Sequence, residues 1–131
     1  MTVAYVSVEQ VLALHREQTR RYGGAAGVRD RGLLESAVAR PAMTFGGEDL
    51  YHDLPAKAAA LMHSLALNHP FVDGNKRVAA HAALVFAASN GYECTATSED
   101  LVDVTLRLAA GAVAVEELAI WFRQRLRPDQ D

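Results

Sequence analysis

The sequence predicts an all-α fold, a compact bundle of about six helices in which residues 1–131 form one domain. Three observations support this prediction. Half of the 131 residues are hydrophobic, which is enough for one core at this length. The hydrophobic residues recur mostly at the three- and four-residue spacing of helices. Gly, Pro and Asn interrupt them at short intervals, as they do at helix ends.

The N-terminal third is expected to contain two helices. Ser7 is a good N-cap for the first helix, because its hydroxyl can accept from a free backbone N–H. Gly23 is a suitable stop for that helix. Asp30 or Arg31 begins a second, shorter helix, and Pro41 closes it, since proline cannot continue a helix.

Two apolar helices are expected in the middle of the chain, after an irregular stretch. Residues 42–53 are polar, contain glycine and show no clear period, so they predict a loop or a small hairpin flap before the third helix. Pro55 suits the first turn of that helix, which is apolar almost all round over residues 56–67. Residues 75–89 form an equally apolar fourth helix that Asn90 ends. Both helices should be buried.

The C-terminal part is expected to add two further helices and a tail. Ser98, followed by two acidic residues, begins a helix that continues to about residue 110. Gly111 interrupts it, and residues 115–126 form the last helix. Residues 127–131 are predicted to be a frayed tail.

Composition narrows the function classes. The net charge of −3 provides no basic field for nucleic acid. The single cysteine, Cys94, excludes an internal disulfide framework and an all-cysteine metal site, which fits a reducing cytoplasm. No apolar run approaches the roughly 20 residues that span a bilayer, and the N-terminus lacks the basic start of a secretion signal. We therefore expect a cytoplasmic protein that binds neither nucleic acid directly nor membranes.

The segment His69–Arg77 combines a histidine, a carboxylate, a Gly-Asn turn and two cations in nine residues. Lys76 and Arg77 fall in the first turn of the predicted fourth helix, where free backbone N–H groups already make the helix end positive. An anion would relieve this conflict. The segment therefore predicts a phosphate site.

His69 and Asp73 each have a functional and a structural interpretation. A neutral imidazole at His69 can take the proton of an attacking hydroxyl as a general base, or His69 can cap the third helix. Asp73 can hold Mg²⁺ against nucleotide phosphates, because this hard cation prefers carboxylate oxygen. Asp73 can also serve as the N-cap of the fourth helix.

The remaining motif residues are predicted to bind the nucleotide. Gly74 and Asn75 would present backbone N–H groups to phosphate oxygens, and the Asn75 side chain would add a donor. Lys76 and Arg77 would neutralise the charge that develops during transfer, so we count them with the catalytic residues as well. Phe71 is grouped with these residues as the buried anchor of the loop.

Other histidines are weaker candidates. His63 and His81 lie on apolar helices and are expected to be hydrogen-bonded core or groove residues. The pair His52-Asp53 would suit a helical metal-dependent phosphohydrolase. That class needs further ligands, which His15, His63 and Asp103 would have to supply.

The segment His69–Arg77 resembles the active-site motif of the Fic/Doc family, His-x-Phe-x-Asp/Glu/Asn-Gly/Ala-Asn-x-Arg. The resemblance extends to residues 22–24, 29–37 and 90–92, and so spans most of the chain. Lys76 stands where nucleotidyl-transferring Fic enzymes have a second glycine, and Ala80 stands where they have a further arginine. Both departures are shared with the Doc (death-on-curing) branch.

Resemblance to the Doc branch implies the toxin of a type II toxin–antitoxin pair. Such a toxin transfers phosphate from Mg-ATP to a threonine of elongation factor Tu and arrests translation, and a neighbouring gene encodes its Phd-like antitoxin. Pro70, Val72 and Gly74 look more like Fic, so AMP transfer is the alternative reaction. A catalytically weak antitoxin-binding module is the alternative from another class.

Inhibition is expected to come from this second protein. Fic proteins that inhibit themselves carry a helix of the form Ser/Thr-x-x-x-Glu-Gly/Asn, and the most similar stretch here, Thr44–Asp49, ends differently and is broken by glycines. The partner is expected to lay a helix or an ordered tail over a groove beside the motif. Residues 42–53 are predicted to leave one edge of that groove uncovered.

Overall fold

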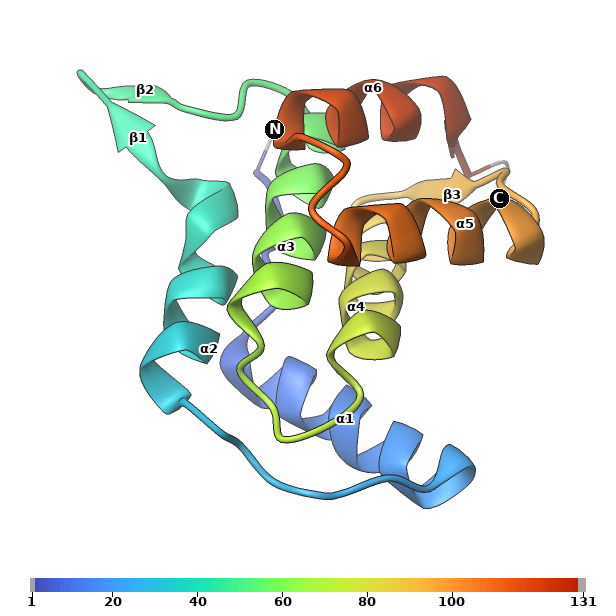
Figure 1. Ribbon diagram of the computed structural model, residues 1–131. Coiled ribbons are helices and arrows are strands. Elements are labelled where there is room, and N and C mark those ends of the chain that lie inside the picture. Colours follow the sequence, from blue (N-terminus) through green and yellow to red (C-terminus); the bar gives the residue numbers. More distant parts are fainter. Residues whose placement is uncertain (1, 130–131) are drawn as a thin grey trace.

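The computed structural model describes residues 2–129, and within that range the chain forms six α-helices, one 3₁₀ turn and two small antiparallel sheets (Figure 1). The helices are α1 (Val8–Tyr22), α2 (Arg31–Ala39), α3 (Leu54–Asn68), α4 (Asn75–Ser89), α5 (Ser98–Ala109) and α6 (Val115–Arg125). The 3₁₀ turn η1 is Arg40–Ala42, and the strands are β1 (Thr44–Phe45), β2 (Glu48–Asp49), β3 (Tyr92–Cys94) and β4 (Leu126–Pro128). The predicted all-α fold class is confirmed.

Local capping sets the ends of the first two helices as the sequence predicted. The Ser7 hydroxyl accepts from Gln10 N at 3.1 Å, and the Gln10 side chain accepts from Ser7 N at 2.8 Å, which is a complete capping box. Gly23, with a φ of 82°, follows the last turn of α1. Asp30 is the N-cap of α2, because its carboxylate accepts from Leu33 N at 3.0 Å.

The helices α3 and α4 form the centre of the core. α3 packs chiefly against α4, α6 and α2 (Figure 1), and its alanine-rich surface allows its neighbours to approach closely. The largest fully buried side chains of the core include Phe71, Phe86 and Phe122. The loop between α3 and α4, residues 69–74, is therefore held at both ends by buried helices at one end of the bundle.

The C-terminal segment differs from the prediction. α6 ends at Arg125, and β4 then pairs with β3 in the register Tyr92↔Pro128 and Cys94↔Leu126. The expected frayed tail is therefore wrong for residues 127 and 128, because Leu126 is buried and the backbone that follows finds partners on β3. Residues 130 and 131 of that tail lie outside the described residues.

The predicted flap is a hairpin in which Thr44 pairs with Asp49. The buried Lys57 of α3 holds its second strand, since the ammonium lies 3.1 Å from the Asp49 carboxylate and donates to Pro41 O at 3.3 Å. The hairpin lies near the N-terminal end of α3, whereas residues 69–74 follow its C-terminal end (Figure 1). No helix within residues 2–129 is both long enough and apolar enough to span a membrane.

Candidate active site

His69 lies at the C-terminal end of α3 in a left-handed backbone conformation, with φ 49° and ψ 56°. It is the one non-glycine residue with a clearly positive φ within residues 2–129. Such a conformation is held only where its surroundings enforce it. Here Arg29 enforces it, because Nε donates to His69 O at 2.6 Å and a terminal guanidinium nitrogen donates to Asn68 O at 2.9 Å. His69 is thus the C-cap of α3, while its imidazole is exposed beside a groove.

The segment between α1 and α2 supports the same loop from outside. Arg29 N and Asp30 N donate to Pro70 O at 2.7 and 3.0 Å, and Val72 N donates to Gly27 O at 3.1 Å. This segment crosses beneath residues 69–74 in Figure 1. Sequence reasoning missed the supporting role of Arg29. Its only signal was that residues 29–37 took part in the family resemblance.

Phe71 and Asn75 close the loop from inside. Phe71 is buried and stacks on His15, with ring centroids 3.9 Å apart and planes 7° apart. The Asn75 side chain accepts from Phe71 N at 2.9 Å and donates to Phe71 O at 3.0 Å. The Asn75 amide, which we expected to donate to phosphate, is therefore engaged within the loop. Its backbone N–H, in the first turn of α4, and the second N–H of the side-chain amide are the donors that remain.

Asp73 and Gly74 form the turn into α4. Gly74, with φ 80°, is the N-cap of the helix. Asp73 therefore does not occupy the N-cap position that was its structural alternative. Its carboxylate accepts from Gly74 N at 2.9 Å and from Ala25 N at 3.3 Å. A carboxylate has about four acceptor positions, so the exposed Asp73 side chain keeps the capacity to bind a cation.

Lys76 and Arg77 are exposed in the first turn of α4, as predicted. The Arg77 guanidinium lies over the Tyr22 ring at 4.3 Å from the centroid. In the part of the chain that the structure describes, neither cation forms an ion pair with a carboxylate. Their charges add to those of the free N–H groups at the helix end. Positive charge is therefore concentrated at the start of α4, next to the Asp73 carboxylate.

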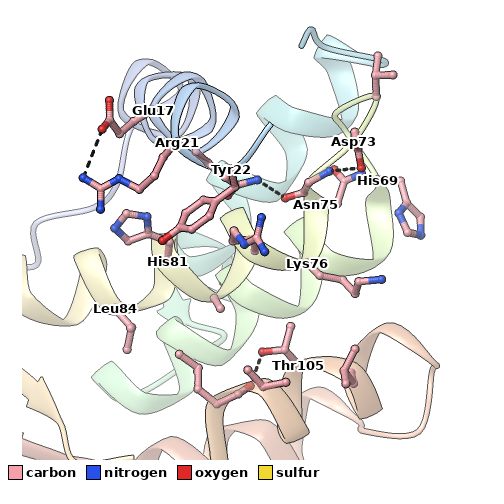
Figure 2. Close-up of a pocket in the computed structure, with 18 residues that line it drawn as sticks. Glu17, Arg21, Tyr22, His69, Asp73, Asn75, Lys76, His81, Leu84 and Thr105 are labelled. Atoms are coloured by element: carbon pink, nitrogen blue, oxygen red, sulfur yellow. Dashed lines mark hydrogen bonds and ion pairs between the residues drawn. The ribbon is translucent and has the colours of Figure 1, made fainter. Parts of the chain in front are cut away.

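These residues lie along a groove of about 920 Å³ (Figure 2). Its walls come from α1, residues 69–74, α4 and α5. His69, Asp73, Gly74, Asn75, Lys76 and Arg77 all line it, so the structure brings together the predicted polar residues of the motif. Further along α4, Ala80, His81 and Leu84 continue the groove floor.

Helix α5, and not the hairpin, forms the exposed edge of the groove, which differs from the prediction. Val102 and Leu106 of α5 line the groove, and both are more than half exposed. Residues 42–53 contribute nothing to the lining. The expected uncovered edge therefore belongs to α5, because the hairpin flap lies near the other end of α3.

The alternative metal-dependent phosphohydrolase is wrong. The Asp53 carboxylate caps α3 by accepting from Ala56 N, and it pairs with Arg123 at 3.0 Å. His63 accepts from Arg40 at 3.0 Å, and its pKa is lowered by burial and then by the Arg40 charge. Within residues 2–129, no three His, Cys, Asp or Glu side chains are grouped so that they could hold a metal ion.

Comparison with known proteins agrees with this geometry. A profile of the Fic/DOC family matches residues 5–87, which include the whole motif. Toxin Doc of Mycolicibacterium smegmatis is 51% identical over 87 residues, which cover 63% of this chain and 67% of that protein. Protein kinase doc of Escherichia phage P1 is 33% identical over 120 residues, which cover 92% of this chain and 94% of that protein.

Proposed function

The chain belongs to the Fic/Doc family, and from this premise we propose that it is the toxin of a type II toxin–antitoxin pair. In this proposal it transfers a phosphoryl group from Mg-ATP to a hydroxyl of a translation factor, with elongation factor Tu as the expected target, and so arrests translation in the cytoplasm. The observation that carries the proposal is the pair of exposed cations at the start of α4, which form no ion pair within residues 2–129, beside the exposed imidazole of His69.

The residues of the groove would share the reaction as follows. The His69 imidazole takes the proton of the target hydroxyl. The hydroxyl oxygen then forms a bond to the γ-phosphorus, and the bond from that phosphorus to the bridging oxygen breaks, so that ADP leaves with the electron pair. Lys76, Arg77 and the backbone N–H groups of the first turn of α4 stabilise the negative charge on the phosphate oxygens.

Asp73 is the residue that would hold Mg²⁺. The donor set fits this ion, because Mg²⁺ is usually bound by one or two carboxylates together with phosphates and water. The Asp73 carboxylate lines the groove and keeps acceptor capacity beyond its two backbone contacts. When bound, Mg²⁺ neutralises phosphate charge and orients the phosphates.

Phosphate transfer is favoured over AMP transfer by two positions on α4. Lys76 replaces the glycine and Ala80 replaces the arginine that Fic enzymes use in their phosphate site, and both residues line the groove. The relative that covers 92% of this chain is named a protein kinase. Pro70, Val72 and Gly74 remain the Fic-like features, so the reaction product has to be identified directly.

The experiment is to incubate the purified protein with Mg-ATP and elongation factor Tu and to measure the mass of the target. We expect a gain of one phosphate group. A gain of AMP would refute the kinase proposal but leave family membership intact, and an unmodified target would refute the proposed substrate.

A pair of histidine variants tests the assigned base. His69→Ala should lower the transfer rate about 10²- to 10⁴-fold, which is the usual contribution of a positioned base. His81→Ala is the matched control, because His81 is also exposed and lines the same groove without belonging to the motif. If His69→Ala lowers the transfer rate no more than His81→Ala does, His69 is not the base.

The antitoxin partner is proposed to cover this same groove. Val102 and Leu106 present apolar side chains one helical turn apart on the α5 wall, and both are exposed in the isolated chain. A segment that folds on contact could bury them with its own apolar face. Occupation of the groove would exclude ATP or the target from His69.

A further inference from the structure

Two buried polar side chains of α1 face the motif loop. His15 and Gln18 are 3% and 6% exposed, and they lie three residues apart, on the same face of the helix. His15 Nε2 lies 2.7 Å from Asp73 O, and Gln18 Nε2 donates to Gly74 O at 3.0 Å. A carbonyl oxygen only accepts, so Nε2 of His15 carries the hydrogen in this contact.

These two contacts help to set the direction of the backbone N–H groups that follow. The carbonyl of one residue and the N–H of the next lie in one rigid peptide plane and point in opposite directions. Gly74 O accepts from Val78 N at 3.0 Å in the first turn of α4, and Gln18 adds a second donor to the same oxygen, which helps to keep the Asn75 N–H directed away from α1. His15, by holding Asp73 O, orients the Gly74 N–H, which donates to the Asp73 carboxylate at 2.9 Å.

The Gln18 amide can both donate and accept hydrogen bonds, and here it only donates. Its Oε1 is buried and has no partner within the described residues, and an unsatisfied buried acceptor is unfavourable. A Cβ atom built on Gly74 would collide with Gln18 Nε2. The amide thus lies directly against the turn, and its donation to Gly74 O accounts for a polar side chain in this buried position.

We propose that His15 and Gln18 are positioning residues for phosphoryl transfer. They act through the loop, since Gln18 aims the Asn75 N–H at the phosphates and His15 holds the Asp73 carboxylate in place. The inference rests on the proposed function, because it assumes that phosphate binds at the start of α4. Both residues stand outside the motif.

The decisive variant is Gln18→Met, which keeps the length of the side chain and removes the donor together with the unpartnered acceptor. We expect a urea midpoint no lower than that of the wild type and a kcat for transfer at least about tenfold lower, since a displaced phosphate donor lowers transition-state stabilisation. The KM for ATP should change less than kcat. His15→Phe should also lower kcat, because it keeps the ring that stacks on Phe71 and lacks the donor to Asp73 O.

A direct readout of positioning is the amide resonance of Asn75. Titration with a non-hydrolysable ATP analogue should shift this resonance in the wild type, and the shift should be smaller in Gln18→Met. Asn90→Ala is the matched control, because the Asn90 amide clamps Phe86 O and Ala4 O near the other end of α4, at 2.8 and 2.9 Å. That variant should lose stability while transfer and the Asn75 shift stay as in the wild type.

The outcomes separate the inference from the proposed function. If Gln18→Met has the same Asn75 shift and the same transfer rate as the wild type, the inference alone is overturned. A loss of stability in Gln18→Met as large as that of Asn90→Ala would also overturn the inference alone. A wild type in which the analogue shifts none of the amides of residues 74–77 would overturn both. A wild-type shift that Gln18→Met loses supports positioning whichever group is finally transferred.

Discussion

Replacing Asn75 by alanine tests whether the amide is a clamp of the loop or a ligand of the nucleotide. Its side chain makes two hydrogen bonds to the Phe71 backbone, at 2.9 and 3.0 Å, and both are partly buried. Each such bond contributes about 0.5–1.5 kcal/mol to stability, so their loss should cost about 1–3 kcal/mol. The better helix propensity of alanine offsets at most about 0.7 kcal/mol of this.

The assay is urea denaturation followed by fluorescence. Trp121 is the single tryptophan of the chain and is buried, so its emission should report global unfolding. We expect a lower urea midpoint with an unchanged slope, which indicates a change in stability alone. Amide exchange adds a local measurement. The Phe71 N–H, which loses its acceptor, should exchange faster, whereas the Val72 N–H keeps Gly27 O and serves as an internal reference.

The adjacent variant Lys76→Ala is the control for the Asn75 experiment. Lys76 is exposed and forms no ion pair within residues 2–129, so its removal should impair transfer and leave the urea midpoint unchanged. The clamp is refuted if Asn75→Ala also keeps the wild-type midpoint while transfer is lost. The side chain would then act on the nucleotide, as the sequence alone had suggested.

Two further predictions concern pH and the partner. Burial and the Arg40 charge lower the pKa of His63 in the folded state, so below the ordinary histidine value of about 6.5 the unfolded state binds more protons. The free energy of unfolding is therefore not reduced by His63 above that pH, and it falls as the pH is lowered further. Urea midpoints between pH 7.5 and about 5.5 should fall more steeply for the wild type than for His63→Gln, with His81→Gln as the exposed control; equal slopes would exclude His63 as the cause. In the complex with the proposed antitoxin, amide exchange should slow in residues 75–84 and 101–106. Protection confined to residues 42–53 would place the partner on the hairpin and contradict groove occlusion.

The helix ends could be predicted from the sequence because the chemistry of a cap is local. Ser7 and Asp30 bond to N–H groups three residues away, and Gly23 ends α1 through its own backbone conformation. The same reasoning located α4 between Gly74 and Asn90. The pairing of β3 with β4 was different. Each strand has three residues, too few to show an alternating pattern, and the partners lie far apart in the sequence.

The motif revealed which groups are present in the site but not which of them are free. The Asn75 side chain was expected to add a donor to phosphate, yet the loop uses this amide to hold Phe71. The groove wall posed the same difficulty. Val102 and Leu106 read as ordinary helix residues, and only the packing of α5 beside α4 places them opposite the motif.

The inward face of α1 carried a signal that the sequence reasoning did not use. The buried residues of this helix are Val11, His15 and Gln18, so two of its three buried residues are polar. A helix that packs on another helix meets carbonyls that already accept within their own helix. A helix that packs on a turn meets carbonyls such as Asp73 O, which lie outside any regular ladder and need donors. The buried His15 therefore indicates irregular backbone opposite α1, whereas Gln18 adds a donor to Gly74 O, which already accepts from Val78 N at 3.0 Å. In this chain the irregular backbone is the loop that carries the candidate phosphate site.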